Sequence, residues 1–300
     1  MTRMRADLLL VLAAAIWGLA FVFQKTAMTA IGPFTFIAAR GVVAALALLP
    51  LALLENRYLR SSPRIVTASP PSGILRSAGL AGLAFFVAAA FQQFGLRTAT
   101  ATNGGFLTAL YVVLTPPLAF LLRGTLPGTV VIPAALLSAI GTWLLGGGAI
   151  SQLSNGDWLI AACAIFWALH VILSESGAAY ERPILFTGLQ FAVVGLAASI
   201  CAWLIEPVSL LALRSATTEI LYVGLLSSAL TFTILTFALN YAPASEAAVI
   251  ISTESLFAAL AGSLLLGEHL PPVGWLGAGM IMAAVLLVQL GSRASRPEPV

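Results

Sequence analysis

The feature that most constrains this chain is a run of seventeen uncharged residues between Asp7 and Lys25. All of them are apolar or small until Gln24. A helix of this length is about 26 Å long, close to the thickness of the hydrocarbon core of a bilayer. The run therefore predicts a helix that crosses a membrane.

The same plan returns 150 residues later, where a second aspartate, Asp157, opens another apolar run. In this register Trp17 matches Trp167, and Pro33 in the next run matches Pro183. An ungapped register of this kind indicates an internal duplication. The predicted parts are a first repeat at 1–148, a second repeat at 157–291 and a tail at 292–300.

Composition excludes a soluble globule. The chain is 60% hydrophobic and 8% charged, whereas soluble domains carry roughly 25% charged residues. The net charge of +3 does not indicate a nucleic-acid partner, because the cations lie between apolar runs rather than in aromatic-rich clusters. The only cysteines, Cys163 and Cys201, fall inside apolar runs. They form no metal or disulfide pattern, so we expect no metal and no cofactor.

Apolar runs recur along the whole chain and predict an all-α integral membrane protein with ten transmembrane helices. Most runs reach the ~20 residues that a spanning helix needs. The first is expected to be a retained helix rather than a signal peptide, because its partner in the second repeat is internal. Residues 55–73 are expected to be a polar linker. The ten runs are 7–27, 33–54, 74–96, 103–122, 127–148, 157–177, 183–205, 217–241, 244–266 and 272–291.

The positive charges indicate how these helices are oriented. With a cytoplasmic N-terminus, ten arginines fall in cytoplasmic segments and three cations on the opposite side. This bias predicts that both termini are cytoplasmic. Because five helices per repeat is an odd number, the repeats are inverted, a plan typical of transporters whose substrate site lies near the midplane. The cytoplasmic arginines are Arg3, Arg5, Arg57, Arg60, Arg64, Arg76, Arg123, Arg182, Arg293 and Arg296, and the opposite cations are Lys25, Arg97 and Arg214.

Four short motifs carry a family resemblance: W-G-L-A-F at 17–21, A-A-R-G-V-V at 38–43, L-T-P-P-L-A at 114–119 and L-L-L-G-E-H-L at 264–270. In this order they resemble the drug/metabolite transporter superfamily, in its EamA-repeat branch. Within it, the sequence is most similar to the bacterial amino-acid exporters of the YddG type. The resemblance implies a ten-helix, multi-pass carrier of the inner membrane, with a central cavity and alternating access.

The two halves differ from each other at two places. Gly124 or Thr125 stands in the first half where the second carries Glu268, and Gln190 stands in the second half opposite Arg40. The halves are therefore not chemically equivalent.

Glu254 is the most informative polar residue, because it lies about 15 Å along its helix, near the middle of the bilayer. An ionisable group there is costly and usually functional; the alternative is a glutamate that hydrogen-bonds to a neighbouring helix. Ser252 and Thr253 make a polar patch beside it. Glu246 is instead expected in the first turn of this helix, with Ser245 as its cap.

Four further residues are open to two interpretations. His170 is expected to be a hydrogen-bonded packing residue more often than a functional one. Trp17 and Trp167 either line a cavity or pack between helices, and each indole N–H needs a partner. For Arg40, the one clearly intramembrane cation, a structural role is favoured.

Uncharged polar residues in the third and fourth runs would suit a zwitterion with an apolar side chain. Pro116 and Pro117 are expected to kink the fourth helix beside a cavity. The polar residues are Gln92, Gln93, Asn103, Thr108 and Tyr111. The predicted substrate-binding set is Trp17, Phe21, Gln92, Thr108, Tyr111, Trp167, His170, Ser252 and Glu254.

These features favour a secondary transporter that exports small solutes, with neutral or aromatic amino acids as the preferred class. The alternatives are a multidrug exporter and a carrier of sugar phosphates or nucleotide sugars, whose anionic substrates would want several cations. An intramembrane enzyme is disfavoured, because the chain has two histidines and no H-E-x-x-H. The expected partners are a small-molecule substrate and the lipid bilayer, without nucleic acid; a monomer and a homodimer both stay open.

Overall fold

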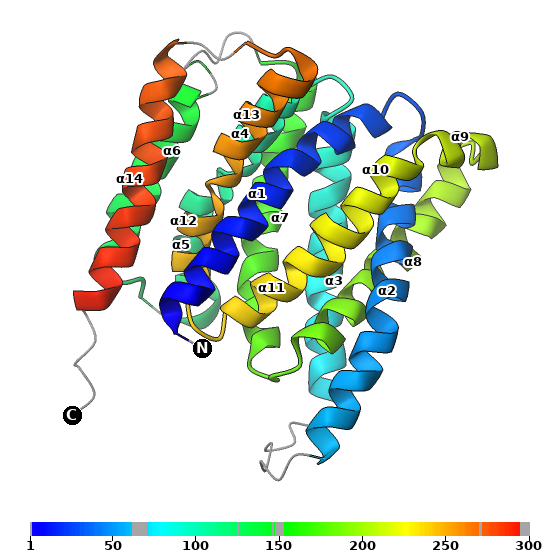
Figure 1. Cartoon of the computed structure of the whole chain (residues 1–300), viewed down its shortest axis with the longest axis horizontal. Coiled ribbons are helices and arrows are strands. Elements are labelled where there is room, and N and C mark those ends of the chain that lie inside the picture. The colour runs from blue at the N-terminus through cyan, green and yellow to red at the C-terminus, as the bar shows by residue number, and fades with distance from the viewer. Residues whose placement is uncertain are drawn as a thin grey trace.

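The structure is a computed structural model that describes residues 2–61, 71–124, 126–145, 147, 153–269 and 272–294. The regular elements in these ranges are all helices (Figure 1). Nine of the described helices are long and apolar enough to cross a membrane, and a shorter apolar helix, α6, has 15 residues. A multi-pass, all-helical membrane protein is therefore confirmed, while the count of ten spanning helices in two inverted repeats stays a prediction.

Several helices form one span between them, so their bounds are given together. The elements are α1 (Arg3–Ala27), α2 (Pro33–Ser61), α3 (Pro71–Gly95), α4 (Ala101–Thr108), α5 (Tyr111–Arg123), α6 (Val131–Leu145), α7 (Asn155–Ala178), α8 (Pro183–Ile205), α9 (Leu210–Ser215), α10 (Thr217–Leu221), a π-helical segment (Tyr222–Leu230), α11 (Thr231–Ala238), α12 (Ala244–Ile251), α13 (Glu254–Leu266) and α14 (Pro272–Ala294).

Some predicted features fall outside the described residues. The predicted linker is shorter than expected, because α2 continues to Ser61 and α3 begins at Pro71. Arginine is a good helix former and its long side chain reaches water, so charge at 57 and 60 does not end α2. Outside the described residues or side chains lie Arg60, Arg64, Thr125, Gly146, Gly148, Leu270, Pro271, Arg293, Arg296 and the tail from 295 to 300.

The helix starts follow local sequence signals. Pro33 and Pro183 open α2 and α8, where a missing N–H and a fixed φ suit the first turn. Before α7, the backbone N–H of Ser154 donates to the Asp157 carboxylate at 2.7 Å, and the N–H of Asp157 donates to the Ser154 hydroxyl at 3.2 Å. This capping box explains why an aspartate begins the second repeat.

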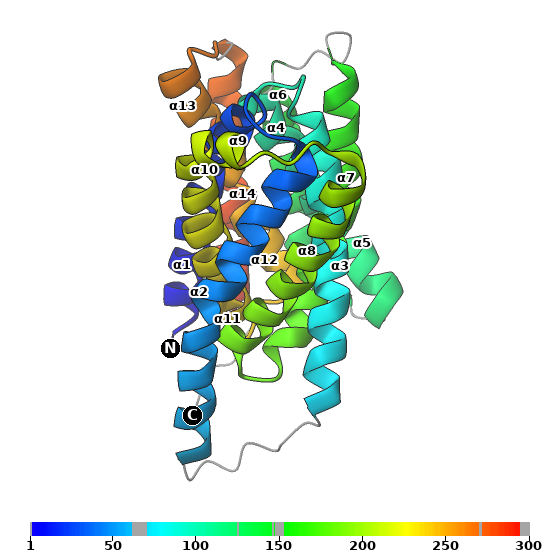
Figure 2. The same ribbon diagram turned by 90° about the vertical axis from the view of Figure 1, so that its right-hand side faces the viewer.

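Helices from the two halves pack in pairs: α2 against α8, α3 against α7, α6 against α14, and α1 against α13. Small residues allow this. A Cβ at Gly41 of α2 would lie 2.9 Å from the Cα of Gly195 on α8, so the backbones are nearly in contact there. Close approach at small residues is how membrane helices associate. The two halves are therefore interlocked rather than placed side by side (Figures 1 and 2).

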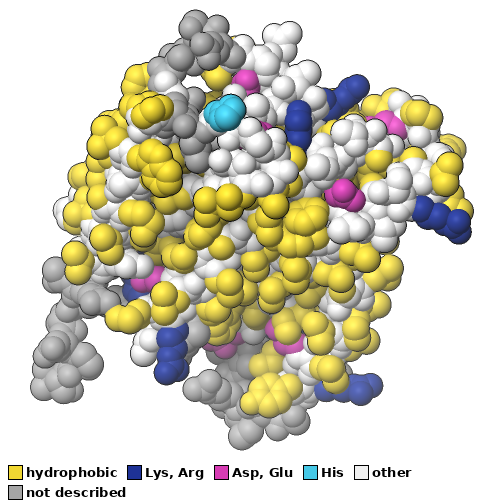
Figure 3. Space-filling view, turned by 45° about the horizontal axis from the view of Figure 1, so that its top comes forward, with side chains coloured by type: hydrophobic (Ala, Val, Ile, Leu, Met, Phe, Trp, Pro, Cys, Tyr) yellow, Lys and Arg dark blue, Asp and Glu magenta, His cyan; other side chains and the backbone are white. Residues whose placement is uncertain are grey.

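We call the end of the helix bundle where α1 begins the N-terminal end, and the opposite end, where α9 lies, the far end (Figure 2). On the face in Figure 3, hydrophobic side chains cover a broad middle zone, and Lys and Arg lie toward its rims. Many large apolar side chains are exposed, among them Leu46, Leu196 and Leu286. In water such a surface would be unstable; against lipid it is expected.

Two predicted helices are broken near their middles, a feature that no sequence pattern predicted. The predicted kink at Pro116 and Pro117 is misplaced: both prolines lie inside α5, and the break comes earlier, at Ala109 and Leu110. Hydrogen bonds of the tighter i to i+3 kind span it, such as Val112 N to Ala109 O at 3.0 Å. The prolines leave carbonyls in the first turn of α5 without helical donors, so the helix restarts just before them.

The second break, between α12 and α13, has a different cause. The hydroxyls of Ser252, Thr253 and Ser255 donate to the carbonyls of residues three positions earlier, at 2.6 to 2.8 Å. Such local bonds compete with the helical ladder. The polar patch beside Glu254 is therefore the cause of the break, and Glu254 becomes the first residue of α13.

Candidate functional site

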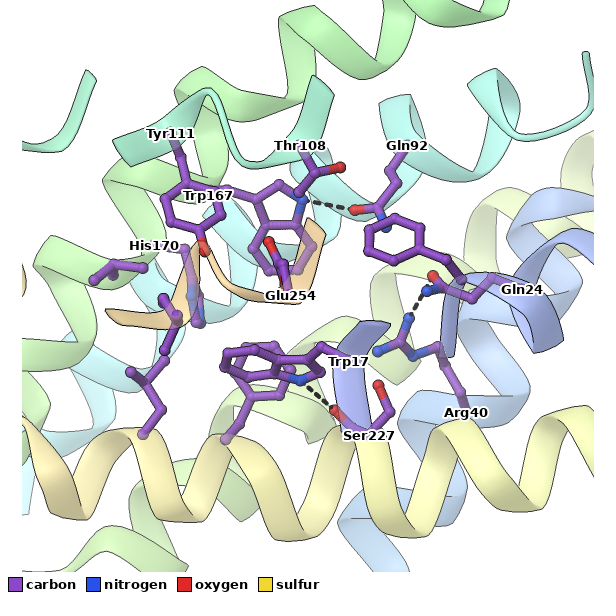
Figure 4. A pocket seen from close by; sticks show the side chains of 15 residues that line it. Trp17, Gln24, Arg40, Gln92, Thr108, Tyr111, Trp167, His170, Ser227 and Glu254 are labelled. Atoms are coloured by element: carbon purple, nitrogen blue, oxygen red, sulfur yellow. Dashed lines mark hydrogen bonds between the residues drawn. The ribbon is translucent and has the colours of Figure 1, made fainter. Parts of the chain in front are cut away.

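A cavity lies between helices of both halves, near the two helix breaks (Figure 4). Eight of the nine residues predicted to bind substrate line it; the exception, Ser252, lies 2.8 Å from the hydroxyl of Ser138 on α6 instead. Their substrate contacts stay a prediction. The lining residues are Trp17, Phe21, Gln24, Arg40, Gln92, Thr108, Tyr111, Trp167, His170, Val171, Ser227, Phe232, Leu235, Ile251 and Glu254.

Tyr111 and Glu254 occupy matching places, because each is the first residue of the helix that follows a break. Both side chains are buried, with exposed fractions of 4% and 5%. The Tyr111 hydroxyl and the Glu254 carboxyl group interact with each other, but neither the hydroxyl nor Oε1 of Glu254 makes a hydrogen bond of ordinary geometry to a described residue. A buried polar atom without a partner is costly, so this part of the cavity is suited to a ligand that supplies hydrogen bonds.

Arg40 lies on the cavity wall and is the one arginine among the described residues that line it. Its guanidinium donates to Oε1 of Gln24 at 3.2 Å and to the hydroxyl of Ser228 at 3.1 Å, and it lies 5.4 Å from the centre of the Phe85 ring. All the described ion pairs involve other residues. These contacts fit the structural role expected from the sequence, and among the described residues they leave the charge of Arg40 without an ion-pair partner.

The two tryptophans use their N–H groups in equivalent ways. Nε1 of Trp17 donates to the carbonyl of Ser227 at 2.9 Å, and Nε1 of Trp167 donates to Oε1 of Gln92 at 2.7 Å. Each indole is thus tied to the other half of the chain while its ring lines the cavity. Ser227 lies in the π-helical segment, and its carbonyl also accepts from the hydroxyl of Thr231 at 2.6 Å. Both interpretations of the sequence, packing and lining, therefore apply to these residues.

His170 lies among aromatic rings, 5.4 to 5.7 Å from those of Phe85, Trp167 and Phe232. Its Nε2 is 3.2 Å from Oε1 of Gln190 and 3.3 Å from the hydroxyl of Ser174. This geometry favours the packing role expected from the sequence. The partners of His170 also show how the two halves of the chain differ.

In the register of 150, Gln190 matches Arg40 and Ser174 matches Gln24. One half of the cavity wall therefore carries a cation, and the equivalent place in the other half is neutral.

Three polar residues singled out in the sequence do other work. The side-chain amide of Gln93 donates to the carbonyl of Gln24 at 2.9 Å, and that of Asn103 donates to Asp157 at 3.1 Å. The prediction that Ser245 caps its helix is wrong, because α12 begins after Pro243 without a side-chain cap. The prediction for Glu246 is confirmed, because it lies in the first turn of α12, where it also accepts from Arg3.

Several lining residues were missed by sequence reasoning. Gln24 stands out in hindsight as the only polar residue of an otherwise apolar run. Ser227, Phe232, Leu235 and Ile251 carry no signal of their own, because nothing in an apolar run shows which face meets a cavity.

The comparisons with known proteins decide the family. The EamA-like transporter family matches residues 4–147 and again residues 154–290. This chain belongs to that family. The predicted membership of the drug/metabolite transporter superfamily is thereby confirmed, and the chain is a membrane transporter; the members of this family are in general not enzymes.

Relatives extend over most of the chain. An uncharacterized transporter of Archaeoglobus fulgidus is 31% identical over 292 residues, which cover 96% of this chain and 87% of that protein. A WAT1-related chloroplastic protein of Arabidopsis thaliana is 25% identical over 287 residues, covering 91% and 66%. The uncharacterized inner membrane transporter YicL of Salmonella typhimurium is 31% identical over 208 residues, covering 66% of each. One crystal structure shares the fold with a TM-score of 0.73 at 18% identity, covering 99% of this chain and 100% of that one.

Proposed function

We propose that this transporter exports small neutral amino acids, with aromatic or other apolar side chains, by alternating access across the inner membrane. The observation that supports it is the presence of both Arg40 and Glu254 on the wall of one cavity (Figure 4). A cation and a carboxyl group in the same cavity match the two ends of a zwitterion, and the sequence resembles amino-acid exporters of the YddG type.

Each end of an amino acid has a partner in this arrangement. The substrate carboxylate binds the guanidinium of Arg40, whose described partners are neutral. The ammonium group binds Oε1 of Glu254 and the Tyr111 hydroxyl, which interact with each other but make no hydrogen bond of ordinary geometry to a described residue. Charge-assisted hydrogen bonds of this kind are roughly twice as strong as neutral ones. The rings of Trp17 and Trp167 then pack against an apolar or aromatic side chain.

The alternatives fit less well. A quaternary ammonium drug has no N–H to give to Glu254 and leaves Arg40 buried without an anion. A sugar phosphate or nucleotide sugar wants several cations, and Arg40 is the one arginine or lysine among the described lining residues.

The cavity must also open during the cycle. It leaves about 50 Å³ of space for the centres of water molecules, enough for roughly three to five of them. An aromatic amino acid needs more room than this, so the walls separate when it enters. This is the behaviour that alternating access requires.

Transport by purified protein in proteoliposomes tests the proposal. Labelled phenylalanine is expected to exchange across the membrane, while a cationic dye and a sugar phosphate are not. Two analogues sharpen the test: phenethylamine lacks the carboxylate and phenylpropionate lacks the ammonium group. Each is expected to compete at least tenfold more weakly than phenylalanine, because it leaves one buried charged group unpaired. Transport of the dye or the sugar phosphate without that of amino acids would contradict the proposal.

We further propose that both termini face the cytoplasm of the cell, as the arginine bias predicts. The described part of α14 ends at the N-terminal end, where α1 begins (Figure 1). A reporter fused after Val300 should therefore be active on the cytoplasmic side, and one inserted at Ser154 on the opposite side. A periplasmic result at Val300 would show that the proposed orientation is wrong.

A further inference from the structure

Glutamates at helix ends join helices of the two halves. We use the term glutamate cap for a carboxylate that accepts hydrogen bonds from backbone N–H groups in the first turn of another helix. Glu55, near the end of α2, caps α8 with bonds of 2.9 and 3.2 Å. Glu206, just after α8, caps α2 with bonds of 2.8 and 2.9 Å. The antiparallel pair of α2 and α8 is therefore fastened at both ends, which favours its movement as one unit.

A third glutamate cap joins the two broken helices at the far end. Glu268, two residues beyond the end of α13, accepts from the N–H groups of Ala101 and Thr102 at 2.8 and 2.9 Å. It also accepts from the Thr102 hydroxyl at 2.5 Å. An anion is favoured at the start of a helix by the aligned peptide dipoles and by the unused N–H groups. Three donors thus hold the end of α13 against the start of α4.

The sequence provides no such carboxylate at the other end of these helices. In the first half α5 ends at Gly124 with φ of 67°, and in the second half α13 ends at Gly267 with φ of 68°. Gly124 and Gly267 therefore match each other, and in this part of the chain the two halves are offset by 143 residues. The next residue is Glu268 in the second half but Thr125 in the first, which lies outside the described residues.

The N-terminal end is fastened by different contacts. There Arg3 of α1 pairs with Glu246 of α12, and Arg123 of α5 pairs with Glu175 of α7. All four side chains are 15 to 25% exposed. These side chains are half-buried, and Arg123 also donates to the carbonyl of Ile172 and to the hydroxyl of Ser176. The two ends of the broken helices are therefore held by contacts of different kinds.

Below the Glu268 cap lies a buried cluster that closes the cavity toward the far end. It contains Phe21, Leu96, Phe106, Cys163 and Ala258. We call α4, α13 and this cluster the far gate. Phe21 also lines the cavity, so a route from the cavity to the far face passes through the far gate.

We propose that Glu268 is the residue that keeps the far gate closed, and that its absence from the first half biases the transporter toward the state closed at the far end. This inference depends on alternating access but not on the identity of the substrate. To open the far gate, α13 must withdraw from α4, and the three hydrogen bonds of Glu268 must break. The pair of α2 and α8 is capped at both of its ends, so these caps favour neither the state open at the far end nor the state closed there.

Cys163 provides a built-in reporter, because its exposed fraction is 0% and it lies in the far gate. In a C201S background it is the only cysteine. The protein is placed in nanodiscs, where a membrane-impermeant methanethiosulfonate reagent reaches both faces, and the rate at which Cys163 reacts is measured without substrate. Glu268→Gln is expected to raise this rate roughly tenfold, since the amide cannot make the charge-assisted bonds. A rate equal to that of the parent would overturn the proposal.

Two further variants separate gating from a local loss of structure. Glu206→Gln removes the same kind of cap at the far end, but from α2 and α8; its rate is expected to match the parent. Thr125→Glu leaves the far end untouched and supplies a carboxylate at the N-terminal end, where Ala244 and Ser245 stand in the places of Ala101 and Thr102. It is expected to raise the Cys163 rate by favouring the state open at the far end. An equal rise in Glu206→Gln, or none in Thr125→Glu, would overturn the proposal. Because no substrate is used, a wrong substrate class leaves these outcomes unaffected.

Discussion

Arg40→Gln is expected to lower the apparent affinity for phenylalanine by about 10- to 100-fold, because a hydrogen-bonded charge contributes about 1.5–3 kcal/mol. Glutamine is the informative replacement, since Gln190 already stands at the equivalent place of the other half. The variant therefore removes the charge that distinguishes the two halves. Competition by unlabelled phenylalanine in proteoliposomes measures the effect.

The analogue that lacks a carboxylate is the matched control for this variant. Phenethylamine has no carboxylate and leaves the guanidinium of Arg40 unpaired in the parent, so its affinity should not fall in Arg40→Gln and should rise toward that of phenylalanine. Thermal stability should not fall either, because the partners that lose the guanidinium, Gln24 and Ser228, are neutral and keep other ways to bond. If the melting temperature falls while both affinities stay unchanged, Arg40 is structural and the zwitterion proposal is wrong.

The fold is largely predictable from the sequence because its cause lies in long-range composition. Runs of about twenty apolar residues leave few options in a bilayer, and the register of 150 by itself pairs Trp17 with Trp167. Glu254 can be found for the same reason, since an ionisable residue stands out in an apolar run. These signals can be recognised in the sequence without knowing which helices pack against each other.

The rest depends on contacts between helices, which the sequence does not show. Asn103 and Thr108 have similar polarity, yet one bonds to Asp157 at a helix end and the other lines the cavity. The break before Glu254 has a local cause in its hydroxyl residues, but such residues also occur in unbroken helices. The sequence favours a structural role for Arg40 because the family resemblance gives this arginine to the family at large, and nothing in the sequence shows that Arg40 and Glu254 line the same cavity.

The two halves of the chain differ both in the cavity and at the ends of the helix bundle. The first half carries the buried cation Arg40, and the second half carries Glu254 and the far-end cap Glu268. Two identical halves would favour neither end of the bundle. Under the two proposals above, divergence after duplication gives the cavity a polar axis for the substrate and gives the transporter a bias between its two open states.

Glu254→Gln is expected to abolish accumulation of phenylalanine against its gradient, which is the largest effect predicted for any substitution. The carboxyl group at the start of α13 can hold either a proton or the substrate ammonium, but not both. Mutually exclusive binding at one buried group is a simple way to couple a proton gradient to export. Glutamine keeps the shape and can accept a hydrogen bond, but it cannot exchange a proton.

The variant should therefore still carry phenylalanine down its gradient when the substrate is abundant, with affinity reduced roughly tenfold by the loss of the charge. With a pH gradient imposed on proteoliposomes, the accumulation ratio should fall to the equilibrium value. Arg40→Gln is the matched control: at raised substrate concentration it should still accumulate phenylalanine, because its carboxyl group at Glu254 is intact. Phenylpropionate, which has no ammonium group, should bind Glu254→Gln at least as tightly as the parent, because the amide leaves no unpaired charge. Accumulation that survives in Glu254→Gln would show that Glu254 does not couple transport to the proton gradient.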